Sequence, residues 1–218
     1  NYEDVITTEP SYAGPKWYVT SNGSDENEGS EVNPFVSIQN AINASSDGDT
    51  IIVSSGTYTE NINFNDKNIV IIGADTETTI IDGNENGSVF NVVASNVSIS
   101  NFTFQNGLSP EGGGLRIENC TIDLDSLVIR DNMTDDNAAG LWIVNSIVNL
   151  NNSKIINNGT SGSPGASAIR STNSNLSITN SLIANNNSSS YTFWNPSWQG
   201  NTTTFNNSII TGNVNGDV

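Results

Sequence analysis

Four charged side chains near the middle of the sequence could together act as a polysaccharide lyase. Asp123 and Asp125 alternate along one expected strand, and Arg116 and Arg130 flank it. Lyases of this kind bind Ca²⁺ through carboxylates and use an arginine or lysine as the base. If the chain is an enzyme, these four residues are the predicted catalytic set.

Other catalytic chemistries are excluded by composition. Histidine is absent from the 218 residues, which removes imidazole acid–base catalysis, Ser-His-Asp triads and histidine-based zinc sites. Cys120 is the single cysteine, so no internal disulfide can form. With no histidine to activate it, Cys120 is expected to be a small, buried or half-buried corner residue.

The segment DENEG at positions 25–29 is the best candidate for a metal site. Asp25 and Asn27 supply oxygen ligands of the type that Ca²⁺ prefers, but the closing bidentate glutamate of a full calcium loop is missing. A plain turn is the alternative. Calcium is the one cofactor that the sequence suggests.

The charge balance limits the partners. The chain has 23 acidic and 6 basic side chains, a formal net charge of −17. A nucleic-acid-binding protein needs a basic surface, so no nucleic-acid partner is expected. No run of 18 apolar residues occurs, and no membrane insertion is expected.

Two series of landmarks show that the chain repeats itself. The segment GGGLRIENCTIDLDSLVIRDN, which begins at Gly112, aligns with AAGLWIVNSIVNLNNSKIINN, which begins at Ala138. Both contain short strands of period two and no helical stripe. One series is Phe90, Leu115, Leu141, Ile169 and Phe193, and the other is Asn101, Ser126, Ser153, Ser181 and Ser208.

This repeat predicts an all-β fold, a right-handed parallel β-helix whose coils stack one strand spacing apart. The landmark spacings of 24 to 28 residues fit one coil of three short strands. Leu124, Leu150 and Ile178 are expected to form a second inward column. Asparagines near the end of each coil are expected to form a polar ladder at a corner: Asn106, Asn158, Asn186 and Asn213.

The same alignment predicts an outward column of arginines and tryptophans: Arg116, Trp142, Arg170 and Trp194. Such a rigid strip suits sugar rings, whose C–H faces stack on tryptophan while arginine binds hydroxyl or carboxylate groups. The alternative is self-contained stacking of arginine on tryptophan that only protects the sheet.

The alignment also weakens the lyase hypothesis. Asn149 and Asn151 occupy the positions of Asp123 and Asp125 in the next coil, so the acids form no column. The favoured interpretation is a solvated strand face with a weak surface ion pair between Arg116 and Glu118.

The first part of the chain is predicted to cover the open end of the solenoid. NPFVSIQNAINASSDGD reads as a short amphipathic helix, with Asn33 as N-cap and buried positions that include Phe35 and Ile38. The expected organisation is an N-terminal extension (1–16), a cap with a short helix (17–50) and β-helix coils (51–218). The last coil carries no cap. A truncated chain, end-to-end self-association or a further domain is expected there.

The segment from Trp17 to Ile62 resembles the start of right-handed parallel β-helix proteins of the pectin-lyase-like superfamily. The motifs are GSDENEG, PF, IQNAI, GDTIIV and GTYTE, as in bacterial secreted or surface proteins, and the later coils are similar to repeats of polymorphic surface proteins. Pectin methylesterases share the start Gly56, Tyr58 and Glu60, but their catalytic patterns do not occur here. The resemblance therefore implies the fold and assigns no catalytic residue.

Three functional hypotheses follow. The first is a non-catalytic module, secreted or on the cell surface, that binds a polysaccharide or cell-surface glycan or mediates adhesion. The second is a Ca²⁺-assisted polysaccharide lyase or related carbohydrate-active enzyme. The third is a purely structural stalk or filament-forming unit.

Overall fold

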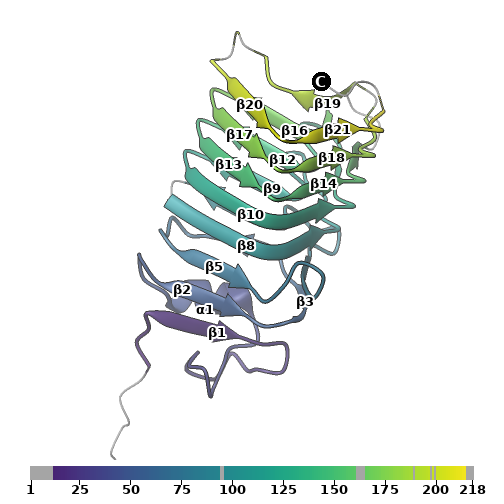
Figure 1. Cartoon of the computed structure of the whole chain (residues 1–218). Coiled ribbons are helices and arrows are strands. Elements are labelled where there is room, and N and C mark those ends of the chain that lie inside the picture. Colours follow the sequence, from purple (N-terminus) through teal and green to yellow (C-terminus); the bar gives the residue numbers. More distant parts are fainter. Residues whose placement is uncertain are drawn as a thin grey trace, which may run out of the picture.

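The chain is a parallel β-solenoid with a single short helix among its described residues. The computed structural model describes residues 12–93, 96–160, 165–188, 190–196, 198 and 200–214. Figure 1 shows the strands stacked one above another from the N-terminal cap, in purple, to the last coil, in yellow. The expected all-β parallel β-helix is confirmed.

Each coil contributes strands to three faces. Face 1 contains β1 (Lys16–Val19), β2 (Thr50–Val53), β5 (Val70–Gly73), the first half of β8 (Asn96–Gln105), the first half of β10 (Thr121–Arg130), β13 (Ile147–Asn151), β17 (Asn175–Thr179) and β20 (Thr202–Asn206). Face 2 contains β3 (Gly56–Thr59), β6 (Thr79–Asp82), the second halves of β8 and β10, β14 (Lys154–Ile156), β18 (Leu182–Ala184) and β21 (Ile209–Thr211). All these pairings are parallel.

Face 3 closes the coil. It contains β4 (Ile62–Asn63), β7 (Phe90–Val93), β9 (Leu115–Glu118), β12 (Leu141–Val144), β16 (Ala166–Thr172) and β19 (Tyr191–Trp194). A small ladder of β11 (Met133–Thr134) and β15 (Gly159–Thr160) lies between faces 2 and 3. From β8 onward, faces 1 and 2 follow each other directly, whereas the passage from face 2 to face 3 is a longer loop.

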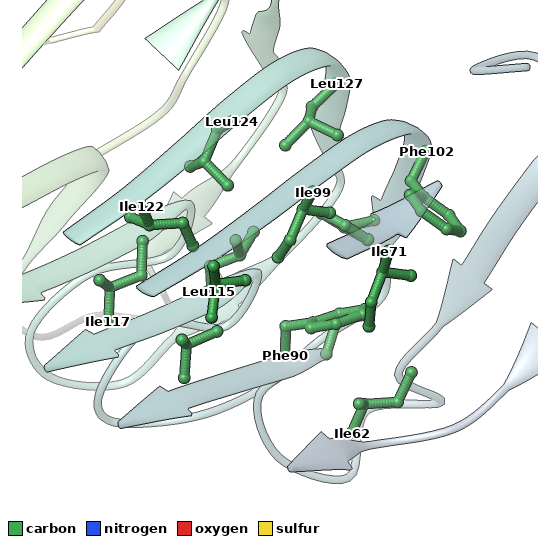
Figure 2. Close-up of a cluster of buried hydrophobic side chains, with 14 of the residues drawn as sticks. Ile62, Ile71, Phe90, Ile99, Phe102, Leu115, Ile117, Ile122, Leu124 and Leu127 are labelled. Carbon is green, nitrogen blue, oxygen red and sulfur yellow. The ribbon is translucent and has the colours of Figure 1, made fainter. Parts of the chain in front are cut away.

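The core consists of stacked columns of apolar side chains. Phe90, Leu115, Leu141, Ile169 and Phe193 are paired in register along face 3, as the sequence predicts. Leu124, Leu150 and Ile178 form the second predicted column, on face 1. Figure 2 shows side chains of the two faces pointing toward one another in the interior. Stacking buries a face that no single coil could bury alone.

The bend between faces 1 and 2 uses one residue in the left-handed conformation per coil. Asn101, Ser126, Asn152, Asn180 and Asn207 occupy this position, with φ between 48° and 65°. The predicted landmark with Ser153, Ser181 and Ser208 is therefore wrong by one residue in those coils, because Ser126 lies opposite Asn152. Ser153 is the next residue along, and its buried hydroxyl accepts from the Leu127 N–H at 3.0 Å.

A buried asparagine ladder follows face 2. Asn158 Oδ1 accepts from the Asn132 backbone N–H at 3.1 Å and from Asn132 Nδ2 at 3.0 Å, and Asn158 Nδ2 donates to Asn186 Oδ1 at 3.0 Å. Asn213 extends the ladder beyond Asn186. The predicted member Asn106 is not part of it: Asn106 has a left-handed φ of 55°, and Gly107 takes the ladder position.

The third corner, between faces 3 and 1, repeats the scheme with smaller side chains. Cys120 aligns with Ser146 and Ser174, as predicted, and all three are buried. The Cys120 backbone N–H donates to Ser146 Oγ at 3.1 Å, and the Ser146 N–H donates to Ser174 Oγ at 3.0 Å. Side-chain oxygens thus satisfy corner amides that a simple bend would leave unpaired.

The helix of the N-terminal cap begins later than predicted. Helix α1 (Ile38–Ala44) has Ser37 as its N-cap, whose side chain accepts from the Asn40 N–H. Asn33 is not the N-cap, because the next residues run alongside β1 and Phe35 bridges to Val19. The expected apolar side of the segment is nevertheless buried, including Phe35 and Ile38.

The solenoid holds α1 at both ends. Glu60 Oε1 and Oε2 accept from the N–H groups of Ile38 and Gln39 at 2.8 and 2.9 Å. Lys67 Nζ donates to backbone carbonyls at the other end, among them Asn43 O at 2.8 Å. These side chains satisfy helix-end groups that have no partner within the helix. Glu60 thus fastens the cap to the solenoid.

Glu60 predicts a pH dependence of stability. Burial raises its pKa above the ordinary 4.5, against the lowering effect of the Gln39 and Ile38 N–H groups. The folded chain therefore binds this proton more tightly than the unfolded chain. The resulting stabilisation is complete below the ordinary pKa and is lost as the pH rises through the raised folded pKa. Urea unfolding should show wild type losing stability relative to Glu60→Gln as the pH rises from the ordinary value of 4.5 through the raised folded pKa. A constant difference over this range would contradict the assignment.

The two ends of the solenoid differ. The N-terminal end is covered by α1, and the extension predicted for residues 1–16 lies mostly outside the described residues. At the other end β20 pairs with β17 alone within the described chain, and Ile209 is 61% exposed. In the described ranges no helix is long and apolar enough to cross a membrane.

Candidate functional site: an arginine–tryptophan strip on face 3

The structure places the four predicted ligand-binding residues in one outward column. Arg116 of β9 pairs with Trp142 of β12, Trp142 pairs with Arg170 of β16, and Arg170 pairs with Trp194 of β19. Their inward neighbours form the face 3 core column, so alternation along each strand directs all four away from the core. We call Arg116, Trp142, Arg170 and Trp194 the face 3 strip.

The strip consists of two stacked pairs. The Arg116 guanidinium carbon lies 5.4 Å from the centroid of the Trp142 ring, and that of Arg170 lies 4.3 Å from the Trp194 ring. Tyr191 extends the second pair, with its ring centroid 5.3 Å from that of Trp194. Each arginine thus covers the tryptophan of the following coil.

The two arginines differ in their charge environment. Arg116 forms ion pairs with Glu111, at 3.1 Å, and with Glu118, the partner expected from sequence. Within the described residues no carboxylate lies at ion-pair distance from Arg170. Burial lowers the pKa of Arg170, and Asp136 opposes this effect. The strip thus has an ion-paired cation, Arg116, at one end and a cation without an ion pair among the described residues, Arg170, toward the other.

Sequence reasoning missed the groove beside Arg116. This groove has a volume of about 400 Å³ and is lined by Asn61, Asn63, Ser88, Asn91 and Glu111 as well as Arg116. Asn63 pairs with Asn91, and Asn91 pairs with Arg116, so the outward column continues from the strip into the groove. The register of β4, β7 and β9 was the signal that could have revealed it.

The predicted lyase residues are not brought together. Asp123 and Asp125 lie on face 1, Arg130 on face 2 and Arg116 on face 3. Asp123 Oδ1 and Asp125 Oδ1 each accept from an asparagine of the next coil at 2.7 Å. Arg130 pairs with Asp131 at 2.9 Å. The four residues therefore belong to three separate surfaces.

The predicted metal ligands are occupied by the cap itself. Asp25 Oδ1 accepts from the N–H groups of Val36 and Ser37 at 3.2 and 3.0 Å, and its Oδ2 accepts from Ser37 Oγ at 2.7 Å. Asn27 Nδ2 donates to Pro34 O at 2.8 Å. The segment is a turn that braces the start of α1. Among the residues described, no group of three or more acidic, cysteine or histidine side chains is arranged to hold a metal ion.

Comparisons with known proteins identify the fold. No protein-family model matches the sequence. A pectin methylesterase variant, solved in complex with a hexasaccharide, superposes with a TM-score of 0.50 at 11% identity, over 78% of this chain and 65% of that one. This likeness shows that the chain has a parallel β-helix fold. A carrot pectin methylesterase aligns over 94% of this chain and 85% of that one, at 16% identity and a TM-score of 0.42.

A curated relative matches part of this β-helix. The uncharacterized protein YwoF of Bacillus subtilis strain 168 is 31% identical over 96 residues, which are 44% of this chain and 19% of that protein. The match thus spans about a fifth of the relative, and the chain spans slightly less than two thirds of the first pectin methylesterase. At this level of similarity to solved structures the likeness concerns the fold.

Proposed function

We propose that this β-helix is a non-catalytic glycan-binding module that acts outside the cell or on its surface. The observation that carries the proposal is the face 3 strip, in which half-buried tryptophan and arginine side chains stand in register on a rigid sheet. Stacked aromatic rings offer the apolar faces that sugar rings bind, and Arg170 forms no ion pair within the part of the chain that the structure describes. Extracellular polysaccharide or a cell-surface glycan is the proposed partner.

The dispersal of the acidic residues supports binding rather than cleavage. A lyase needs its metal-binding carboxylates and its base around one reacting sugar. Here Asp123 and Asp125 lie on face 1, while Arg116 lies on face 3. The four strip residues carry no carboxylate, and Glu111 and Glu118 beside the strip form ion pairs with Arg116.

Trp142→Ala is expected to abolish measurable glycan binding without unfolding the chain. A flat strip offers few shielded contacts, so wild-type affinity should be near millimolar, about −4 to −6 kcal/mol. The removed ring points outward, so the core column keeps its packing. The measurement is NMR titration with a panel of neutral and uronic-acid hexasaccharides, and circular dichroism monitors folding. Trp198→Ala is the matched control, because Trp198 is 78% exposed and outside the strip.

Two results would overturn this function. Release of unsaturated sugars that is lost in Arg116→Ala or Asp123→Ala would make the chain a lyase. No binding to any glycan, with no cleavage, would favour the structural stalk.

A further inference from the structure

We infer that the groove beside Arg116 is a separate subsite for a neutral sugar, at the end of the strip nearest the N-terminal cap. The inference rests on the proposed function, because it treats the groove and the strip as parts of one glycan site. Its first support is continuity: Asn63, Asn91 and Arg116 are consecutive members of the column that carries Trp142. Arg116 both lines the groove and stacks on Trp142.

The second support is the unused hydrogen-bonding capacity of the groove. Asn61 Nδ2 donates to the carbonyls of Gly83 and Ser88, Asn63 Oδ1 accepts from the Asn65 N–H, and Asn91 Oδ1 accepts from Arg116 at 3.4 Å. The other polar atom of each amide, Asn61 Oδ1, Asn63 Nδ2 and Asn91 Nδ2, has no partner among the described residues. One acceptor and two donors on side chains that line the groove therefore remain available, which matches hydroxyl groups that both donate and accept.

The third support is the local charge. Arg116 is shared between Glu111 and Glu118, so the three charged groups carry one net negative charge. A carboxylate ligand entering the groove would meet Glu111 without a spare cation, and like-charge repulsion would disfavour it. A neutral polyhydroxylated ring has no such cost. The groove volume of about 400 Å³ lies within the range of small-ligand sites.

The chemistry of the ligand therefore changes along the site. Around Asn63 and Asn91 the structure selects neutral sugar units through amide groups. Three coils further along than Asn63, the column reaches Trp142, and the next coil presents Arg170, which forms no ion pair with any described residue. A single glycan that occupies both parts would lie along the solenoid axis and cross several coils.

The test is a titration of ¹⁵N-labelled protein with galactohexaose, a neutral probe, and with hexagalacturonate, an acidic one. The side-chain NH₂ signals of Asn63 and Asn91 are assigned by their loss in Asn63→Ala and Asn91→Ala. They should shift with galactohexaose along the same saturation curve as the Trp142 indole N–H, and should not shift with hexagalacturonate. The double alanine variant should bind galactohexaose about five- to tenfold more weakly, while the face 1 control Asn175→Ala should bind normally.

The outcomes separate the two proposals. If the Trp142 signal shifts and the amide signals do not, the subsite is refuted and the proposed function stands. If the amides respond to galactohexaose and Trp142 does not, the strip is not part of the site and the continuous site is refuted. If hexagalacturonate shifts the amides as strongly as galactohexaose, selection for a neutral sugar is refuted. No response to either probe at any of these groups contradicts both proposals.

Discussion

Phe90→Ala is expected to lower the free energy of unfolding by about 3–5 kcal/mol, the usual cost of emptying a fully buried phenylalanine site. Phe90 is completely buried, and its ring centroid lies 4.9 Å from that of Phe104 and 5.4 Å from that of Phe64. These rings come from three successive coils, so the cavity would lie where faces 2 and 3 meet the cap. Equilibrium urea unfolding, followed by circular dichroism, measures the loss.

The matched control for this change is Phe205→Ala in the last coil. Phe205 is 37% exposed and contacts Phe193 at a centroid distance of 5.8 Å. Its removal should cost less than half as much, because part of the side chain already faces water. Equal losses at the two positions would contradict the assignment of Phe90 to a tightly packed core.

Asn158→Ala is expected to lower the free energy of unfolding by about 2–4 kcal/mol, although it replaces a buried polar side chain with an apolar one. Asn158 is fully buried, and its side chain accepts twice from Asn132 and donates to Ile129 O and Asn186 Oδ1. Alanine would leave both donors of Asn132 and the Ile129 carbonyl without this partner. Each buried polar group left unpaired costs roughly 1–3 kcal/mol.

The measurement for Asn158→Ala is urea unfolding beside Asn175→Ala. Asn175 is exposed on face 1, so its replacement should change stability by no more than about 0.5 kcal/mol. Asn158→Asp is a further comparison, since a carboxylate can accept from Asn132 but cannot donate to Ile129 O. A loss below about 0.5 kcal/mol for Asn158→Ala would show that the ladder is not a source of stability.

The sequence predicts the columns of face 3 well and the corners less well, for a physical reason. Leu115, Leu141 and Ile169 are buried and each is followed by an outward residue of the strip, so a register error of one residue would expose them. At the corners a left-handed residue is followed by a buried polar one, as in Asn152 and Ser153. Asparagine and serine suit both positions, so residue type alone does not distinguish them.

The candidate site also has features that the sequence predicts and features that it does not. The outward direction of Trp142 follows from alternation, and its register was predictable from the inward column beside it. Arg170 stacks on Trp194 because of the conformation of its side chain, which the sequence pattern does not determine. The groove beside Arg116 depends on the position of Glu111, which lies in the loop before β9 and outside any strand.

Helix placement at the cap shows how tertiary contacts override a local signal. Asn33 followed by proline is a good helix start, but Phe35 pairs with β1 and the turn continues to Ser37. Asp25 then binds the N–H groups of Val36 and Ser37 from a distant loop. Only contacts between segments far apart in sequence decide between these two starts.

The loop between faces 2 and 3 is where the chain tolerates changes in length. In each coil the loop runs from the buried corner residue at the end of face 2 to the core residue of face 3. These start and end residues are Gly107 and Leu115, Asn132 and Leu141, Asn158 and Ile169, and Asn186 and Phe193. The number of residues between them differs in each coil. By contrast, Ile122 to Asn132, Val148 to Asn158 and Leu176 to Asn186 are all the same distance apart in sequence.

In these three coils the segment that spans faces 1 and 2 is thus constant in length, and the loop that follows it is adjustable. A one-residue insertion in β10 or β13 would turn the side chains in the rest of that strand to the other side of the sheet, so that core residues would point outward. An insertion between Thr134 and Ala138 would leave both flanking columns in register. Comparison of the coils with one another therefore marks this loop, which leads into face 3, as the natural point for inserting a foreign segment.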